Sequence, residues 1–340
     1  MLFLEDMRSQ TITQRPFTSY ALRSRCLLLL ALPVILLLSS CWTSSAPSTQ
    51  QIRMAYQPIV FGLPVFVGNE QKIFEKHNLS VDAKSFTSAN DMMNALVAGQ
   101  VDMVPGAPLV PVLSLEAQYP GRFRVMSHSV MTSDRPFDRI LVKADSPIKS
   151  PQDLSGKKLA LIPGTTASNA TRAFLKKQGV DPQTVNFIQL APTAQLPALQ
   201  SGSVDALYAY EPLVTIALNQ GSDFRAISGS IYTSLLEPCP LVVLIVDRNF
   251  ERQHPDTVKR AAAAFDDIFK LMREQPAVAN AALVPYLKIP GNVAPKVNLQ
   301  NMTYSGQMQL DNLQRFIDIL REIGEIQNPI DAKQLTAETR

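Results

Sequence analysis

The sequence predicts an α/β protein with two lobes, each built on a mostly parallel sheet with helices on both faces. The first observation is a repeat: residues 95–103 read ALVAGQVDM, and residues 198–206 read ALQSGSVDA, 103 positions later. This spacing is far longer than the roughly 20–50 residues of solenoid and propeller repeats. The repeat therefore indicates two similarly built lobes. Chance likeness between two helix–glycine–strand units is the alternative.

The second observation is a regular alternation of strand-like and helix-like patterns, which is typical of parallel sheets covered by helices. In the first block, Pro64 suits the first turn of a helix. Ser88 and Asp91 form a capping-box-like helix start, and Gly99 suits a helix C-terminus. The predicted strands here are 52–56, 80–86, 101–106, 123–129 and 139–144, and the predicted helices are 64–79, 88–98 and 109–119.

The second block repeats this scheme. Its last strand, LVVLIVD, is a continuous apolar run, and Gly179 and Gly202 close two of its helices. The predicted strands are 158–164, 185–190, 204–210 and 241–247, the predicted helices are 166–178, 193–200 and 212–219, and three more helices follow at 255–276, 277–288 and near 306–323. Two such sheets in one chain predict a ligand cleft between them.

Composition excludes several classes of function. The chain has 340 residues, of which 46% are apolar and 18% charged, and this fits a globular protein. The formal net charge is +3, there is one tryptophan, and no run of Lys or Arg occurs, so we expect no nucleic-acid partner. In the part expected to fold, Cys239 is the one cysteine, so no internal disulfide is expected. We expect its thiol to be packed and inert.

The N-terminal region has the pattern of a targeting segment. Residues 26–38 form an apolar run of 13 behind Arg23 and Arg25, which is the length of a signal-peptide core and short for a membrane span. The run ends in Leu-Ser-Ser-Cys41, which resembles a bacterial lipobox. We therefore expect a lipoprotein signal peptide at 1–40, a lipid-modified Cys41 and a flexible tether at 41–51. An ordinary signal peptide with an incidental cysteine is the alternative.

Four stretches together resemble the periplasmic substrate-binding proteins of ABC importers. The family is the NitT/TauT group, which binds nitrate, taurine, alkanesulfonates and thiamine precursors. The stretches are ALVAGQVDM, SPIKSPQDLSGKKLALIPGTTAS (146–168), ALQSGSVDALYAYEPLV (198–214) and LVVLIVDRNFERQHPDTVKR (241–260). The likeness covers about residues 52–325, and the lipobox agrees with it because many such proteins are tethered beside their permease.

The resemblance implies a type II periplasmic-binding-protein fold. One lobe would comprise 52–138 plus 246–335 and the other 139–245, with strands near 139–144 and 241–247 crossing as a hinge. Each repeated block would form the core of one lobe. The repeated aspartates, Asp102 and Asp205, are expected to be structural.

Candidate ligand contacts lie in loops that follow strands, since ligands of open α/β sheets bind beyond the carboxyl ends of the strands. Helix N-termini there present free N–H groups that suit an anion. Plain helix capping is the alternative for each Ser and Thr. The candidates in these loops are Gln57, Phe61, Gly62, Ser88, Asn90, Gly106, Ala107, Gly164, Thr165 and Thr166.

Two further candidates, Tyr210 and Glu211, follow the strand 204–210. Glu211 would repel a simple anion and suit an amine or a protonated ring, or else it stabilises a helix N-terminus. Phe61, Phe66 and Tyr210 are expected to stack on a flat ligand. Arg135 and Arg139 are the cationic candidates, and solvated charges at the hinge rim are the alternative for them.

The predicted function is capture of a small organic ligand, such as a sulfonate, a carboxylate or a heteroaromatic ring, by hinge closure and delivery to an ABC permease and ATPase. We expect a monomeric lipoprotein of the periplasm or cell surface with no metal and no cofactor. A ligand-sensing or scaffold lipoprotein is one alternative. The other is an enzyme on the same fold related to thiamine-pyrimidine synthesis, although the cysteine-rich iron motif of those enzymes is missing and His77, His128 and His254 are isolated.

Overall fold

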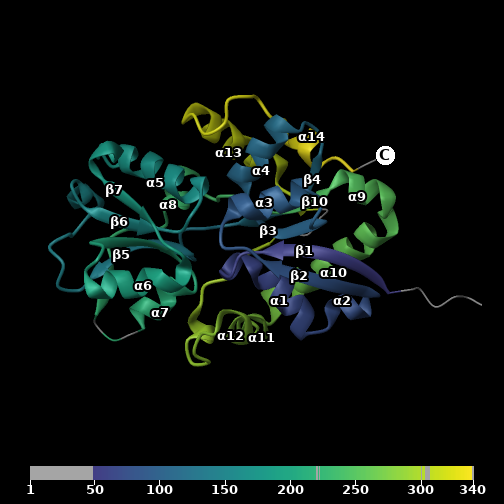
Figure 1. Ribbon diagram of the computed structural model, residues 1–340, viewed down its shortest axis with the longest axis horizontal. Helices are drawn as coiled ribbons and strands as arrows, with labels where there is room; N and C mark the ends of the chain where they lie inside the picture. The colour runs from purple at the N-terminus through teal and green to yellow at the C-terminus, as the bar shows by residue number, and fades with distance from the viewer. Residues whose placement is uncertain (1–48, 220, 222, 300, 303–306, 339–340) are drawn as a thin grey trace, which may run out of the picture. The chain divides into compact units, whose positions relative to one another are not determined.

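Two mixed β-sheets organise the residues that the structure, a computed structural model, describes: 49–338 except 220, 222, 300 and 303–306 (Figure 1). The first sheet has six strands, in the order β11 (Asn301–Met302), β4 (Phe123–Val130), β10 (Val242–Asp247), β3 (Met103–Pro108), β1 (Gln50–Tyr56) and β2 (Leu79–Ser85). The second has five, in the order β7 (Asn186–Gln189), β6 (Lys158–Leu161), β8 (Ala206–Tyr210), β5 (Asp138–Lys143) and β9 (Phe224–Ala226). The sheets define a first and a second lobe.

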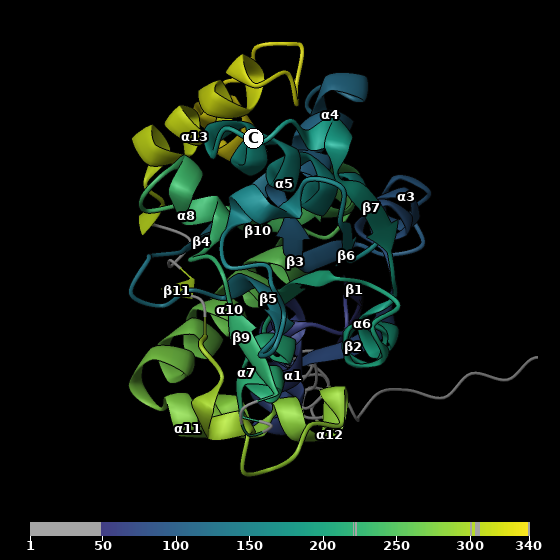
Figure 2. The same ribbon diagram turned by 90° about the vertical axis from the view of Figure 1, so that its left-hand side faces the viewer.

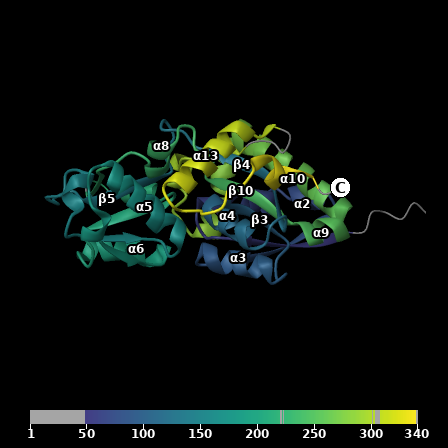
Figure 3. The same ribbon diagram turned by 90° about the horizontal axis from the view of Figure 1, so that it is seen from above.

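Helices cover both faces of each sheet, as predicted. Around the first sheet, α1 (Leu63–Glu70) and α10 (Pro255–Glu274) lie on one face and α4 (Leu109–Gln118) and α13 (Leu310–Glu322) on the other (Figures 1 and 2). Figure 3 shows α5 (Thr165–Lys177) over the second sheet. The remaining helices are α2 (Ile73–Lys76), α3 (Ala89–Val97), α6 (Pro192–Ser201), α7 (Leu213–Leu218), α8 (Ile231–Leu235), α9 (Arg248–Gln253), α11 (Pro276–Ala281), α12 (Leu283–Leu287) and α14 (Ala332–Thr336), with 3-10 turns η2 (Val60–Gly62), η3 (Pro151–Leu154), η4 (Pro182–Thr184) and η5 (Ala294–Lys296).

The sequence repeat occupies the same place in both sheets. The first copy forms the end of α3 and the start of β3, and the second copy forms the end of α6 and the start of β8. The neighbouring strands match as well: β2, β1 and β3 are parallel and are followed by antiparallel β10, while β7, β6 and β8 are parallel and are followed by antiparallel β5. Two equivalent β-α-β-α-β units explain the repeat better than chance likeness does.

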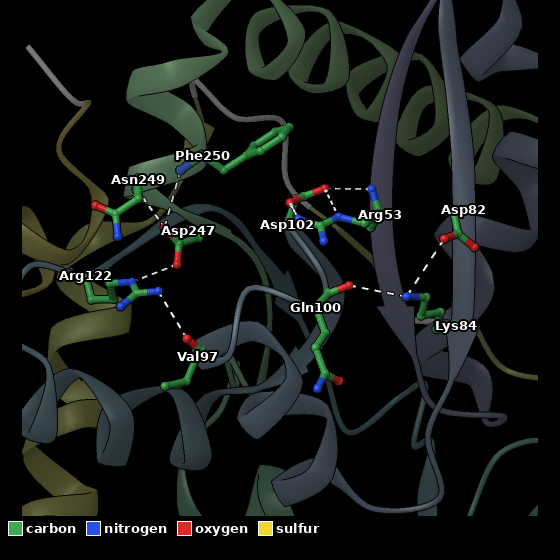
Figure 4. A network of polar contacts seen from close by, with 10 residues as sticks. All are labelled: Arg53, Asp82, Lys84, Val97, Gln100, Asp102, Arg122, Asp247, Asn249 and Phe250. Atoms are coloured by element: carbon green, nitrogen blue, oxygen red, sulfur yellow. Dashed lines mark hydrogen bonds and ion pairs between the residues drawn. The ribbon is translucent and has the colours of Figure 1, made fainter. Parts of the chain in front are cut away.

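The repeated aspartates fix the starts of parallel strands, as Figure 4 shows for the first copy. The Asp102 carboxylate accepts hydrogen bonds from the backbone N–H of Arg53 at 2.8 Å and from its Nε at 3.1 Å. In the second copy, the Asp205 carboxylate accepts from the backbone N–H of Lys158 at 2.8 Å. Each aspartate therefore links β3 or β8 to the strand paired with it, which is a structural role.

The chain passes between the lobes in two segments that touch. Residues 131–137 connect β4 to β5, and residues 236–241 lead from α8 to β10. The backbones of Met131 and Cys239 exchange two hydrogen bonds, of 3.1 and 2.9 Å. The two strands expected to cross between lobes each lie within one sheet. The predicted boundary between residues 245 and 246 falls inside β10, which pairs along its length with β3 and β4 of the first sheet.

Local backbone conformation accounts for two other differences from prediction. The helix expected at 64–79 is broken into α1 and α2, because Lys72 has a left-handed φ of 53°. The strand expected at 158–164 ends at Leu161, and Gly164, which precedes α5, takes a φ of 124° that glycine tolerates and other residues rarely adopt. Both changes shorten an element without altering the order of the elements.

Candidate functional site

Four aromatic rings pack where the lobes meet. Phe137 of the first crossing segment stacks on Tyr210 of β8 with a ring separation of 5.4 Å, and Phe61 of η2 lies 5.8 Å from Tyr210. The Tyr210 hydroxyl lies 3.0 Å from the hydroxyl of Tyr232 in α8. All four side chains are buried. The predicted candidates Phe61 and Tyr210 thus come together, and they stack on protein rings. Phe66 stacks elsewhere, on Tyr286.

Glycine and alanine in β3 allow the loop after β1 to approach this cluster. A Cβ atom on Gly106 would lie 2.0 Å from the carbonyl oxygen of Phe61, and Ala107 beside it is fully buried. A Cβ atom on Gly62 would lie 2.9 Å from the carbonyl oxygen of Gln57. The structure therefore brings Gln57, Phe61, Gly62 and Gly106 together and explains both glycines by close backbone packing.

A cavity of about 280 Å³ opens beside this junction, with walls from both lobes. Its volume is close to the lower end of the roughly 300–1,000 Å³ of small-molecule sites. Of the predicted site residues, Tyr210 and Glu211 line it, together with Pro58 and Ile59 from the loop after β1. The other lining residues are Ile162, Pro192, Thr193, Gln195, Leu196, Pro197, Pro212, Leu213, Ile216, Leu287 and Ile289.

Glu211 is buried at the wall of this cavity, with 1% of its surface exposed. Its carboxylate accepts hydrogen bonds from the Thr215 backbone N–H at 3.1 Å and from the Thr215 hydroxyl at 2.9 Å. Burial raises the pKa of Glu211 to about 7, although the bonds from Thr215 act in the opposite direction. These contacts fit the alternative in which Glu211 stabilises the first turn of α7. Its backbone carbonyl also accepts from the N–H of Val60 at 3.3 Å, which joins the two lobes.

Two buried polar atoms beside the junction lack a hydrogen-bond partner among the described residues. They are Gln57 Oε1, in the loop after β1, and Thr166 Oγ1, in the first turn of α5. These loops are equivalent in the two repeated units, since each follows the first strand of its unit. Buried polar atoms are normally hydrogen-bonded. Neither residue lines the cavity of about 280 Å³, and Thr166 lines a separate small cavity together with Tyr232 and Phe316. Gly164 provides the turn into α5, and Thr165 is exposed.

The remaining predicted residues do not line the cavity. The Ser88 hydroxyl accepts from the Asp91 N–H at 3.1 Å and so caps α3, while Asn90 is exposed. Arg139 donates to the carbonyl of Ser228 at 3.1 Å. Arg135 is exposed and borders a separate groove of about 670 Å³ between α10, α11 and η5.

The sequence reasoning missed two walls of the cavity. One is the N-terminal turn of α6, with Thr193 and Gln195, and the other is the end of α12, with Leu287 and Ile289. The first had a signal, because Thr193-Ala194-Gln195 stands before the second copy of the repeat as Ser88-Ala89-Asn90 stands before the first. The second had none, since α12 reaches the cavity through packing between segments distant in the sequence.

Cys239 and His128, two side chains suited to catalysis, are enclosed. Cys239 is fully buried, and burial raises the pKa of its thiol. His128 is fully buried too, accepts from the Gln309 N–H at 2.9 Å through Nε2, and has its pKa lowered by burial. The part of the chain that the structure describes contains no cluster of three or more His, Cys, Asp or Glu arranged to hold a metal. Within the same residues, no helix is long and apolar enough to cross a membrane. Cys41 and the expected signal peptide lie outside the described residues.

Comparison with known proteins agrees with this architecture. The taurine-binding periplasmic protein of Escherichia coli (strain K12) is 25% identical over 283 residues, which cover 82% of each chain. The alkanesulfonate-binding protein SsuA from Xanthomonas axonopodis pv. citri, in a structure with bound MOPS, superposes with a TM-score of 0.69 at 18% identity, over 86% of this chain and 99% of SsuA.

An enzyme shares the fold as well. The desulfurization enzyme DszB superposes with a TM-score of 0.63 at 16% identity, over 85% of this chain and 96% of the enzyme. The predicted periplasmic-binding-protein fold is therefore confirmed, and it is a fold that also carries catalysis. The model of the NMT1/THI5-like family matches residues 62–279, more than half of the sequence. The chain belongs to the NMT1/THI5-like family.

Proposed function

We propose that this protein is the solute-binding component of an ABC importer and delivers a small organic ligand to a permease and its ATPase. The observation that carries the proposal is the cavity of about 280 Å³ whose walls come from the strand ends of both lobes. A ligand in such a place contacts both lobes and stabilises their closed arrangement. The taurine- and alkanesulfonate-binding relatives support this role.

The ligand's polar group is proposed to bind where the two equivalent loops leave polar atoms unpaired. Gln57 Oε1 is able to accept a hydrogen bond from a ligand, and the unpaired Thr166 hydroxyl is able both to donate and to accept one. Thr165 and Thr166 begin a helix of 13 residues, whose free N–H groups favour a negative group such as a sulfonate or a carboxylate. Tyr210 and Glu211 line the cavity between the lobes. A heteroaromatic ring with both donors and acceptors satisfies the same atoms.

We further propose that the protein works as a monomeric lipoprotein in the periplasm or at the cell surface. The Leu-Ser-Ser-Cys41 sequence after the apolar run 26–38 supports this placement. Replacement of Cys41 by serine tests it: the full-length variant is expected to leave the membrane fraction of the producing cell, while the unchanged protein stays in it. Retention of the variant in that fraction would contradict lipid anchoring at Cys41.

An enzyme is the second candidate, because DszB has the same fold. The described residues favour binding over catalysis. The Cys239 thiol and the His128 ring are fully buried, and neither lines the cavity. A sensory lipoprotein that feeds no transporter would have the same site, and it differs only in lacking a permease that recognises the closed form.

A thermal-shift screen of the chain from residue 42 onward tests the proposal. The panel contains sulfonates, carboxylates, amino acids, pyrimidines and nitrate. A ligand present at 100 times its Kd stabilises the native state by about 2.7 kcal/mol, which shifts the melting temperature by several degrees. A dose-dependent shift supports ligand capture, and loss of the shift in Thr166→Val supports binding of the ligand's polar group at the start of α5. Absence of any shift from a folded protein would contradict it.

A further inference from the structure

Most of the residues that line the cavity between the lobes are apolar, and the polar ones are Thr193, Gln195, Tyr210 and Glu211. Ile162, Leu196, Leu213 and Ile216 of the second lobe face Leu287 and Ile289 of the first. No lysine or arginine is among the described residues that line it. The region beyond the strand ends therefore provides a hydrophobic surface in addition to the polar loop atoms.

Two of the polar side chains in these walls, Gln195 and Glu211, form hydrogen bonds within the second lobe. The Gln195 side chain is buried and donates to the carbonyl of Leu190 at 3.1 Å. Both oxygens of the Glu211 carboxylate accept hydrogen bonds from Thr215. An ammonium group placed against the apolar residues would lose its hydration, and the carboxylate that lines the cavity, that of Glu211, already accepts a hydrogen bond on each oxygen.

A segment of the first lobe completes the cavity over the second. Figure 2 shows α12 below α6 and α7. Lys288 directly follows α12 and has a left-handed φ of 53°, so the chain turns sharply between Leu287 and Ile289, and both residues line the cavity. The turn η5 holds the same region to α7, because Lys296 Nζ donates to Asn219 Oδ1 at 2.7 Å.

We propose that this cavity binds the apolar body of the ligand, so that the protein selects molecules with an alkyl or aryl body and discriminates against short zwitterions such as taurine. The inference rests on the proposed function, since it assigns a ligand class to the same site. Each CH₂ buried in an apolar site contributes about 0.8 kcal/mol, which corresponds to roughly a fourfold gain in affinity per methylene.

Titration calorimetry with linear alkanesulfonates from ethane- to octanesulfonate, and with taurine, tests the proposal on the chain from residue 42 onward. Alkyl carboxylates and alcohols of equal length separate the contribution of the head group. The Kd is expected to fall about fourfold per added methylene until the cavity is filled. Taurine is expected to bind at least tenfold more weakly than butanesulfonate.

Substitutions at the cavity wall test whether Leu287 and Ile289 contact the apolar body of the ligand. Leu287→Ala and Ile289→Ala together are expected to shift the chain-length series toward longer chains and to weaken binding of mid-length sulfonates about tenfold. Val284→Ala is the matched control, because Val284 lies in the same helix, is half-buried and does not line the cavity. Circular dichroism confirms that each variant is folded.

The outcomes separate the two proposals. Binding of taurine with no dependence on chain length would overturn the apolar-body inference and leave ligand capture intact. A chain-length dependence that the Leu287/Ile289 variant leaves unchanged would also overturn it, because the apolar contact would then lie elsewhere. Failure of the folded protein to bind any member of the series, or any compound of the wider screen, would overturn both proposals.

Discussion

Two residues at the junction of the lobes, Glu211 and Gly106, are tightly constrained by the groups packed around them. Glu211 has a carboxylate buried beside the cavity, bonded to the start of α7 and linked through its backbone to Val60 of the other lobe. Gly106 has a backbone so close to Phe61 that no side chain fits between them. Each has a consequence that can be measured without knowledge of the ligand.

The first consequence is a pH-dependent stability. Burial raises the pKa of Glu211 from 4.5 to about 7, so the folded protein binds this proton more tightly than the unfolded chain does. The stabilisation by protonated Glu211 is fully present below about pH 4.5 and is lost as the pH rises through 7, at a cost of about 3 kcal/mol. In Glu211→Gln, the free energy of unfolding measured in urea is expected to fall less between pH 5 and 8. Asp138, buried with a pKa raised to about 6, is unchanged in both proteins and cancels in the comparison. An equal fall in the free energy of unfolding for the variant and the unchanged protein would contradict the raised pKa of Glu211.

The second consequence concerns packing at Gly106. Gly106→Ala would place a methyl group 2.0 Å from a backbone oxygen, and the loop after β1 would have to move. Overpacking of this kind costs about 1–3 kcal/mol or more. The control is Gly229→Ala, because a Cβ atom there meets nothing within 4 Å. Urea unfolding is expected to show a large loss for the first variant and little change for the second. If the two variants were equally stable, the loop after β1 would be able to move away from a side chain at position 106 at little cost.

At the scale of elements, the repeated aspartates tie parallel strands together with unequal strength. Asp102 is buried and also forms an ion pair with Arg53, whereas Asp205 is exposed. Removal of a buried acceptor leaves the Arg53 N–H unpaired and costs about 1–3 kcal/mol. Asp102→Ala is therefore expected to reduce the free energy of unfolding more than Asp205→Ala, which should cost less than about 1 kcal/mol. The reverse order in chemical denaturation would refute this ranking.

A comparison of the predicted and observed helices and strands shows how far the sequence determines the structure. Both copies of the repeat were placed correctly, because a capped helix, a glycine and an apolar strand are local signals. The short elements β9 and α8, with three and five residues, are too short to show a periodic pattern, although Ser230 caps α8. The candidate loops were located, yet the walls that face the cavity came largely from α6 and α12. Their place depends on packing between segments far apart in the chain, which no local pattern records.

At the scale of the whole described unit, the lobes are joined on two sides by polar contacts outside the cavity. Asn169 of α5 donates to Glu325, which follows α13, and Lys296 of η5 donates at 2.7 Å to Asn219, which follows α7. Burial raises the pKa of Glu325 despite its bond to Asn169. These contacts exist only while the lobes are close together, so they bias the equilibrium toward the closed form.

Loss of these contacts is therefore expected to weaken ligand binding from a distance. Each hydrogen bond contributes about 1 kcal/mol, or roughly a fivefold change in the ratio of closed to open protein. Apparent affinity falls in proportion to the closed fraction. Asn169→Ala combined with Asn219→Ala should raise the Kd of the best ligand about tenfold in calorimetry and increase the radius of gyration of the unliganded protein in X-ray scattering. Gln152→Ala is the control, because its bond to the Gln178 carbonyl at 3.1 Å lies within one lobe. A double variant that binds as tightly as the control would mean that the contacts between the lobes do not set the closed population, and that the ligand alone draws the two sheets together.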